Sequence, residues 1–99
     1  MSKRIQLQHP QGKIAPKIDE EKYYQIRSAI ITTLQRTPNL TFTQLTTEIK
    51  KLLAGKFEGS VGWYVVSVKL DLEARGEITR HPGNPETYTL PEMNAATTG

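Results

Sequence analysis

Few residues of this sequence have the types and the spacing that catalysis or metal binding requires. The two histidines, His9 and His81, lie far apart and there is no cysteine, so no group of ligands has the spacing of a metal site. The pair Gly55-Lys56 precedes further glycines and faintly resembles a phosphate-binding loop. That loop requires Ser or Thr directly after the lysine, where Phe57 stands, so a plain turn between two helices is the better interpretation.

The carboxylates and hydroxyls of the central region are also poorly placed for catalysis. Asp71 and Glu73 are two positions apart on a predicted helix and therefore do not face each other. We expect both to be solvated charges rather than a general acid and a general base. Ser60 and Ser67 have no neighbouring base in the sequence that would activate them. We therefore predict that the protein is not an enzyme and uses no metal and no cofactor.

Positive charge is concentrated near the N-terminus. Residues 1–18 contain Lys3, Arg4, Lys13 and Lys17 and no acid, and the formal net charge of the whole chain is +3, which leaves −1 for the rest. A basic arm of this kind can follow DNA phosphates, whereas the body has no positive excess of its own. The alternative interpretation is a tail that only increases solubility.

Composition indicates a small cytoplasmic domain. The chain has 99 residues and no cysteine, so a disulfide framework is excluded. No apolar run approaches the ~20 residues that span a bilayer, and the N-terminal residues lack the apolar segment of a secretory signal. We therefore expect no membrane partner.

Three regions are predicted along the chain. Residues 1–17 contain two prolines and a glycine without sustained periodicity, which predicts a basic flexible arm. Ile5 and Leu7 alternate there with polar residues, as in a short strand. Residues 18–90 form the domain, and residues 91–99 are small and polar and predict a disordered tail.

Caps, apolar spacing and stops predict the first two helices. The first helix begins at the cap Asp19 and ends at Thr37, directly before a proline. A short edge strand is expected at residues 40–42. The second helix begins at the cap Thr43 and ends at Gly55.

The third predicted helix extends from the cap Ser60 to the stop Gly76 and has apolar stripes on two opposite sides. At about 100° per residue, the first stripe consists of Val61, Val65, Val68 and Leu72, and the second of Trp63, Val66, Leu70 and Ala74. We expect the first stripe to face the core. The second stripe then requires a cover: the N-terminal residues (Ile5, Leu7 and Ile14), another copy of the chain, or a partner.

The helices are followed by a predicted β-hairpin. Residues 77–81 and 86–90 alternate between polar and apolar types, which places Ile78, Tyr88 and Leu90 in the core. A turn with two prolines, a glycine and an asparagine joins the strands. The predicted fold class is therefore α+β.

This order of elements resembles the winged-helix variant of the helix-turn-helix domain. The run Leu72-Glu73-Ala74-Arg75-Gly76-Glu77-Ile78 is similar to the Leu-Glu-x-x-Gly-x-Ile run with which many winged-helix regulators pass from the third helix into the first wing strand. The segment 59–64 is similar to the corresponding entry in small, stand-alone bacterial winged-helix proteins of unassigned function. The resemblance implies a three-helix winged helix-turn-helix with a short edge strand and a C-terminal hairpin as the wing.

In winged-helix proteins the third helix enters the major groove of DNA, and the wing contacts phosphates or the minor groove. The resemblance therefore implies a small protein that binds double-stranded DNA and regulates transcription. The residues that it assigns to nucleic-acid binding are Lys3, Arg4, Lys13, Lys50, Lys51, Lys56, Ser60, Trp63, Tyr64, Ser67, Lys69, Arg80, His81 and Asn84.

The alternative hypothesis is a winged-helix module that binds protein or forms a homodimer and does not bind DNA. Its interface would be the second stripe of the third helix, Trp63, Val66, Leu70 and Ala74. Base edges are read by Arg, Lys, Asn and Gln, which this stripe lacks. Symmetric dimers are the commonest oligomers, so the hypothesis includes a dimer.

Overall fold

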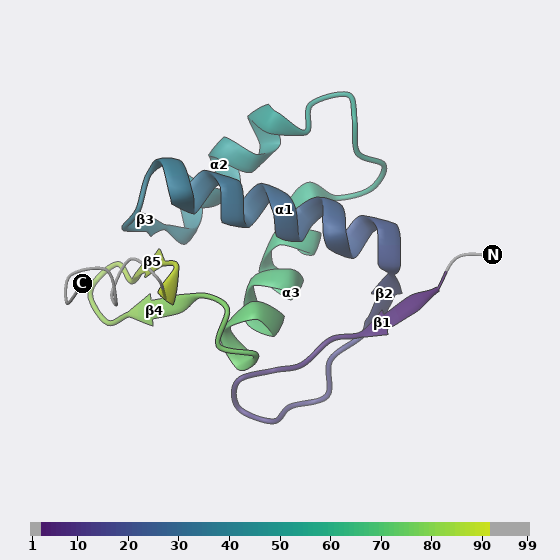
Figure 1. The fold of residues 1–99 in the computed structure, drawn as a ribbon, viewed down its shortest axis with the longest axis horizontal. Helices are drawn as coiled ribbons and strands as arrows, with labels where there is room; N and C mark the ends of the chain where they lie inside the picture. Colours follow the sequence, from purple (N-terminus) through teal and green to yellow (C-terminus); the bar gives the residue numbers. More distant parts are fainter. Residues whose placement is uncertain (1–2, 92–99) are drawn as a thin grey trace.

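The computed structural model describes residues 3–91, and this part of the chain has an α+β fold with three helices and two small antiparallel sheets (Figure 1). The elements in chain order are β1 (Arg4–Gln6), β2 (Lys17–Asp19), α1 (Glu20–Arg36), β3 (Leu40–Thr41), α2 (Phe42–Leu52), α3 (Val61–Ala74), β4 (Thr79–His81) and β5 (Thr87–Thr89). The predicted α+β class is confirmed. The predicted disordered tail falls almost entirely on residues 92–99, outside the described residues.

The first helix has the predicted ends. The Asp19 carboxylate accepts hydrogen bonds from the backbone N–H groups of Glu21 and Lys22, so it satisfies donors that the first turn leaves free. Thr37, before Pro38, is extended and ends the helix. The buried face of α1 includes Ile26, Ile30 and Leu34, all without exposed surface.

The second helix begins two residues earlier than predicted. Thr41, not Thr43, is the cap: its Oγ1 accepts a hydrogen bond from the N–H of Gln44, whose side chain accepts one from the N–H of Thr41 in return. This reciprocal capping box satisfies two donors at once. Phe42 therefore belongs to the helix and not to the edge strand.

The third helix has the predicted start, stop and buried face. The Ser60 Oγ accepts a hydrogen bond from the N–H of Trp63, and Gly76 has the left-handed φ of +74° that ends many helices. The first stripe of α3 is the buried one, since Val65, Val68 and Leu72 have no exposed surface.

The C-terminal hairpin is part of a three-stranded sheet of order β3-β5-β4. Tyr88 in the central strand is opposite Leu40 on one side and Arg80 on the other. As predicted, Ile78, Tyr88 and Leu90 are buried. The edge strand that the sequence suggested at residues 40–42 therefore joins the hairpin in one sheet.

The N-terminal segment is ordered where the sequence predicted a flexible arm. Residues 4–19 form a β-hairpin in which Ile5 is opposite Ile18. Together with Lys3, whose carbonyl accepts a hydrogen bond from the N–H of Glu20, they are hereafter called the N-terminal hairpin. Leu7 is buried in the core at 3% exposure, and its N–H donates to the carbonyl of Pro16. The prediction of a flexible arm is therefore corrected. Leu7 and Ile18 are buried in the core and attach the N-terminal segment to the body. The boundary predicted after residue 17 therefore does not separate this segment from the domain.

One glycine inside α3 and one just after its end provide a matched test of backbone conformation. We expect Gly76→Ala to lower the free energy of unfolding by about 1 kcal/mol, because alanine is strained at positive φ. Gly62→Ala lies inside the helix and should raise it by about 0.5 kcal/mol. A Cβ at either position meets no atom within 4 Å, so crowding plays no part. Urea unfolding measures the free energy of unfolding of both variants. A loss of stability in both would contradict the assignment of a left-handed conformation to Gly76 and a helical one to Gly62.

Candidate functional site

The outward face of α3 carries the second apolar stripe predicted from the sequence. Trp63 is 46% exposed, and Val66, Leu70 and Ala74 are half-buried. These side chains lie about half a helical turn away from Val65, Val68 and Leu72. We call the surface formed by Trp63, Val66, Leu70 and Ala74 the outward face.

One border of the outward face is closed by Asp71, which attaches the N-terminal hairpin to α3. The Asp71 carboxylate has no exposed surface. It accepts hydrogen bonds from the N–H of Gln8 at 2.7 Å, from the hydroxyl of Tyr23 at 2.6 Å and from Nε of Arg75 at 2.9 Å. Nη2 of Arg75 also donates to the carbonyl of Gln6. The hairpin therefore flanks α3 along the Asp71–Arg75 turn.

These contacts change the acidity of two groups. Burial raises the pKa of the Tyr23 phenol well above its ordinary value, and its hydrogen bond to the Asp71 carboxylate raises that pKa further. The hydrogen bond that Arg75 donates to the Asp71 carboxylate likewise raises the pKa of the Arg75 guanidinium. Tyr23 therefore remains a neutral donor and Arg75 a cation, which is the combination that a buried carboxylate requires.

The opposite border of the outward face is closed by Glu73, which connects α3 to the C-terminal hairpin. Nζ of Lys69 lies 2.6 Å from the Glu73 carboxylate, and both side chains are almost completely buried. Nε of Arg80 reaches the same carboxylate at 3.2 Å. Lys69 also donates to the hydroxyl of Tyr88 and lies 4.7 Å from the centre of its ring. Glu73 thus joins the helix and the hairpin.

Three sequence-based expectations are corrected by this arrangement. Asp71 and Glu73, expected as solvated charges, are buried and paired. Lys69, assigned to nucleic-acid binding, is 5% exposed and neutralised by Glu73, so it does not reach a ligand. The missed signal was in the spacing: Lys69 with Glu73 and Asp71 with Arg75 are opposite charges four residues apart on a helix.

The other residues assigned to nucleic-acid binding are spread over the molecule. Exposed ones are Lys3, Arg4 and Lys13 on the N-terminal hairpin, Lys50 and Lys51 on α2, Lys56 in the following loop, and Asn84. Several others have internal partners: Ser60 caps α3, Tyr64 packs on aromatic rings, Arg80 pairs with Glu73 and Glu86, and His81 contacts the hydroxyl of Thr89. Ser67 is half-buried beside the outward face.

An aromatic cluster at the start of α3 was not found from the sequence. The rings of Phe57 and Trp63 each meet Tyr64 edge to face, at 5.1 and 4.9 Å between centroids. Nζ of Lys22 lies within 6 Å of two of these rings, a cation–π geometry. Gly59 has φ +113°, and a Cβ there would lie 3.3 Å from the Tyr64 ring. The glycine-rich segment is therefore a packed connection between α2 and α3. This is the turn between two helices that the sequence favoured over a phosphate-binding loop.

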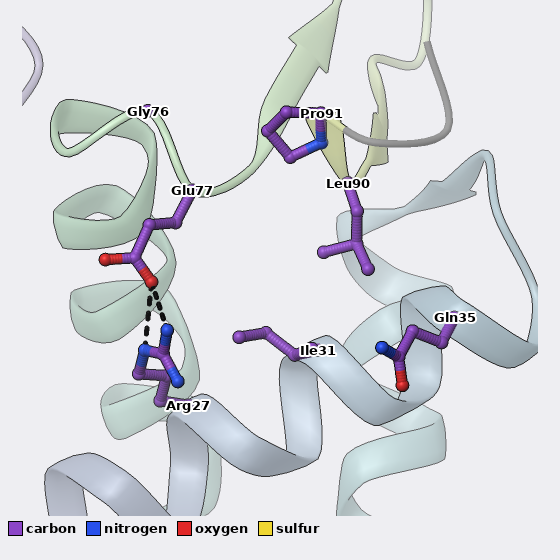
Figure 2. Close-up of a pocket in the computed structure, with 7 residues that line it drawn as sticks. All are labelled: Arg27, Ile31, Gln35, Gly76, Glu77, Leu90 and Pro91. Atoms are coloured by element: carbon purple, nitrogen blue, oxygen red, sulfur yellow. Dashed lines mark hydrogen bonds and ion pairs between the residues drawn. The ribbon is translucent and has the colours of Figure 1, made fainter. Parts of the chain in front are cut away.

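A hollow of about 500 Å³ lies between α1 and the start of the C-terminal hairpin (Figure 2). Figure 2 shows the Arg27–Glu77 ion pair at one side and the apolar side chains of Ile31 and Leu90 within it. Gln35, Gly76 and Pro91 complete the lining. Among the described residues, the buried side-chain atoms without a hydrogen bond belong to Thr33 and Thr46, which do not line this hollow. Its polar groups are thus already paired or solvated.

Residues 3–91 offer neither a metal-ion site nor a helix that could cross a membrane. No cluster of three or more histidine, cysteine or acidic side chains in this range has the geometry to hold a metal ion. None of the helices described there has both the length and the apolar character for crossing a membrane.

Comparison with known proteins places a region that includes all three helices in one family. A family model, described as a family of unknown function (DUF6958), matches residues 4–88. The chain belongs to this family. Neither a curated protein nor a solved structure matches it significantly. Because the DUF6958 match begins at Arg4, both strands of the N-terminal hairpin lie in the region shared by the family.

The attachment of the hairpin by Asp71 can be tested by Asp71→Asn. An amide has one acceptor oxygen and no charge, so buried partners lose their bonds, and we expect the free energy of unfolding to fall by about 2 kcal/mol. Hydrogen exchange at the Gln8 amide should accelerate more than exchange in α2. The control Glu77→Gln breaks a pair that is a third exposed and should cost no more than about 1 kcal/mol. Unchanged Gln8 protection would contradict the attachment.

The raised pKa of Tyr23 predicts a loss of stability at alkaline pH. Because the folded-state pKa lies above the unfolded value of about 10, the stability linked to this phenol is complete below pH ~10 and is lost as pH rises beyond it. Ultraviolet titration of phenolate should show that Tyr23→Phe removes a phenol that ionises only above the ordinary range of tyrosine. The control Tyr24→Phe, at a half-exposed ring, should leave that phenol in place. Its persistence in Tyr23→Phe would contradict the prediction.

Proposed function

We propose that this protein is a winged-helix module that binds another protein through the outward face of α3. The winged-helix part is supported by the order of α1, β3, α2, α3 and the C-terminal hairpin, by the left-handed Gly76 and by the burial of Leu72 and Ile78. Winged helices serve both as DNA-binding and as protein-binding domains. The choice between these two functions depends on the chemistry of α3.

The observation that carries the proposal is the absence of charge on the outward face. Trp63 exposes nearly half of its surface there, next to the half-buried Val66, Leu70 and Ala74. The acids of the helix, Asp71 and Glu73, are neutralised along its borders. A neutral apolar strip that begins with an exposed tryptophan has the composition of a protein interface core.

Binding of double-stranded DNA is the second candidate, and the exposed cations of the N-terminal hairpin favour it. Lys3, Arg4 and Lys13 are all exposed and suited to phosphates. Recognition of bases is less well supported than contact with phosphates, because Lys69 is buried and Arg80 is paired with Glu73 and Glu86. The apolar side chains of the outward face offer no bidentate partner for bases. The geometry therefore supports protein binding better.

Photocrosslinking in cells tests the proposal. We expect p-benzoylphenylalanine in place of Trp63 to form a protein adduct, and the additional change Leu70→Glu to abolish it by placing a charge in the apolar strip. The control is the same group in place of Tyr24, an aromatic of similar exposure on α1, which should give no such adduct. Circular dichroism verifies folding of each variant.

The competing function predicts different results from the same protein. The protein-binding proposal is wrong if two results are obtained together. The first is that p-benzoylphenylalanine in place of Trp63 forms no protein adduct. The second is that the protein binds duplex DNA at ~50 mM salt and releases it by ~200 mM salt. Adducts that persist in the Leu70→Glu variant would also contradict the proposal.

A further inference from the structure

We infer that the partner of the outward face is an acidic amphipathic helix. The inference rests on the proposed function and adds the chemistry of the ligand. It is argued from two observations: the charge of the hairpin that borders the face, and the spacing of the apolar side chains along α3.

The two borders of the outward face differ in charge. On the C-terminal hairpin, Arg80 is neutralised by Glu73 and Glu86. On the N-terminal hairpin, four exposed cations, Lys3, Arg4, Lys13 and Lys17, take part in no ion pair with any residue of the described range 3–91. The acid of this hairpin, Asp19, is engaged in capping α1. The hairpin that carries this unpaired positive charge meets α3 at Asp71 and Arg75, at the C-terminal end of the face. Positive charge at that end complements an acidic ligand.

The apolar side chains suit a helix rather than a strand. Trp63, Val66, Leu70 and Ala74 follow one another at steps of three, four and four residues, which is the ridge that a second helix packs against. The small Ala74 at the end allows close approach of backbones. A helix of about three turns has the length of this strip at 1.5 Å per residue, and helix-in-groove binding uses anchors of the same spacing.

A second copy of the chain fits these observations less well. The chain has a formal net charge of +3, so two copies repel each other rather than complement the basic hairpin. The four side chains of the face are also few compared with the ~20–30 residues per partner of a standard stable interface. A short acidic helix requires neither a large area nor a neutral hairpin.

The probe is a synthetic peptide of about five turns, with leucines at helical spacing i, i+4, i+7 and i+11 and glutamates on the remaining face, compared with the same peptide carrying lysines in place of the glutamates. Binding is followed by the fluorescence of Trp63, the single tryptophan of the chain. We expect the glutamate peptide to bind at least ~10-fold more tightly than the lysine peptide, since a few exposed charge pairs together contribute about 1.4 kcal/mol.

Matched charge reversals locate the site. Lys13→Glu with Lys17→Glu should weaken binding of the glutamate peptide ~10-fold, whereas Lys50→Glu with Lys51→Glu, the same change of charge on exposed positions of α2, should change it less than ~2-fold. Thermal unfolding confirms that both double variants fold. Preference for the lysine peptide, equal effects of the two reversals, or displacement of the peptide by duplex DNA would each overturn the inference.

Failure of this inference is distinguishable from failure of the proposed function. A dimer in light scattering that Leu70→Glu dissociates would overturn the acidic-helix partner and leave protein binding through α3 intact. If the crosslinking group in place of Trp63 forms no protein adduct in cells, both the acidic-helix partner and the proposed function are overturned.

Discussion

Asp71 has no exposed surface, so its negative charge must be neutralised inside the protein. A buried carboxylate without partners is very costly, and the structure supplies three donors from three different parts of the chain: Gln8, Tyr23 and Arg75. These contacts fix the N-terminal hairpin, α1 and α3 relative to one another. The N-terminal segment is ordered for two reasons: its backbone donates a hydrogen bond to the buried Asp71 carboxylate, and Leu7 is buried in the core.

Glu73 has the corresponding role on the other side of α3. It neutralises the nearly buried Lys69 and also binds Arg80 of the C-terminal hairpin. The sheet supports this arrangement, because Tyr88 in its central strand contacts Lys69 through both hydroxyl and ring. In Figure 1 the two hairpins accordingly lie at different sides of α3.

The neutralised borders determine the character of the surface between them. Because the acids and Lys69 are used internally, the outward face presents only apolar side chains, with Trp63 the most exposed of them. The neutral, apolar character of this face is the basis on which we propose protein binding rather than base readout for α3. Positive charge remains exposed on the N-terminal hairpin, and in our proposal it orients an acidic ligand.

Local signals in the sequence were sufficient for much of the fold. Asp19 and Ser60 cap their helices, Gly76 ends α3, and the periodicity of Val65, Val68 and Leu72 identifies the buried face, because each of these effects acts over a few residues. The second helix was misplaced by two residues because Thr41 and Thr43 are both good caps, and only the capping box with Gln44 distinguishes them.

The tertiary structure decided what the charges do. The sequence contains Asp71, Glu73 and Lys69, yet whether a charge on a helix is solvated or buried depends on what packs beside it. Gln8 and Tyr23 lie 63 and 48 residues from Asp71 along the chain. Arg80 and Tyr88 are closer in sequence, but they contact α3 only because the chain turns back after Gly76. The same holds for the N-terminal segment, whose strand pairing with residues 17–19 and contact with Asp71 are long-range. The two apolar stripes of α3 could therefore be predicted from the sequence. The neutral borders, which make one stripe a candidate interface, depend on tertiary packing alone.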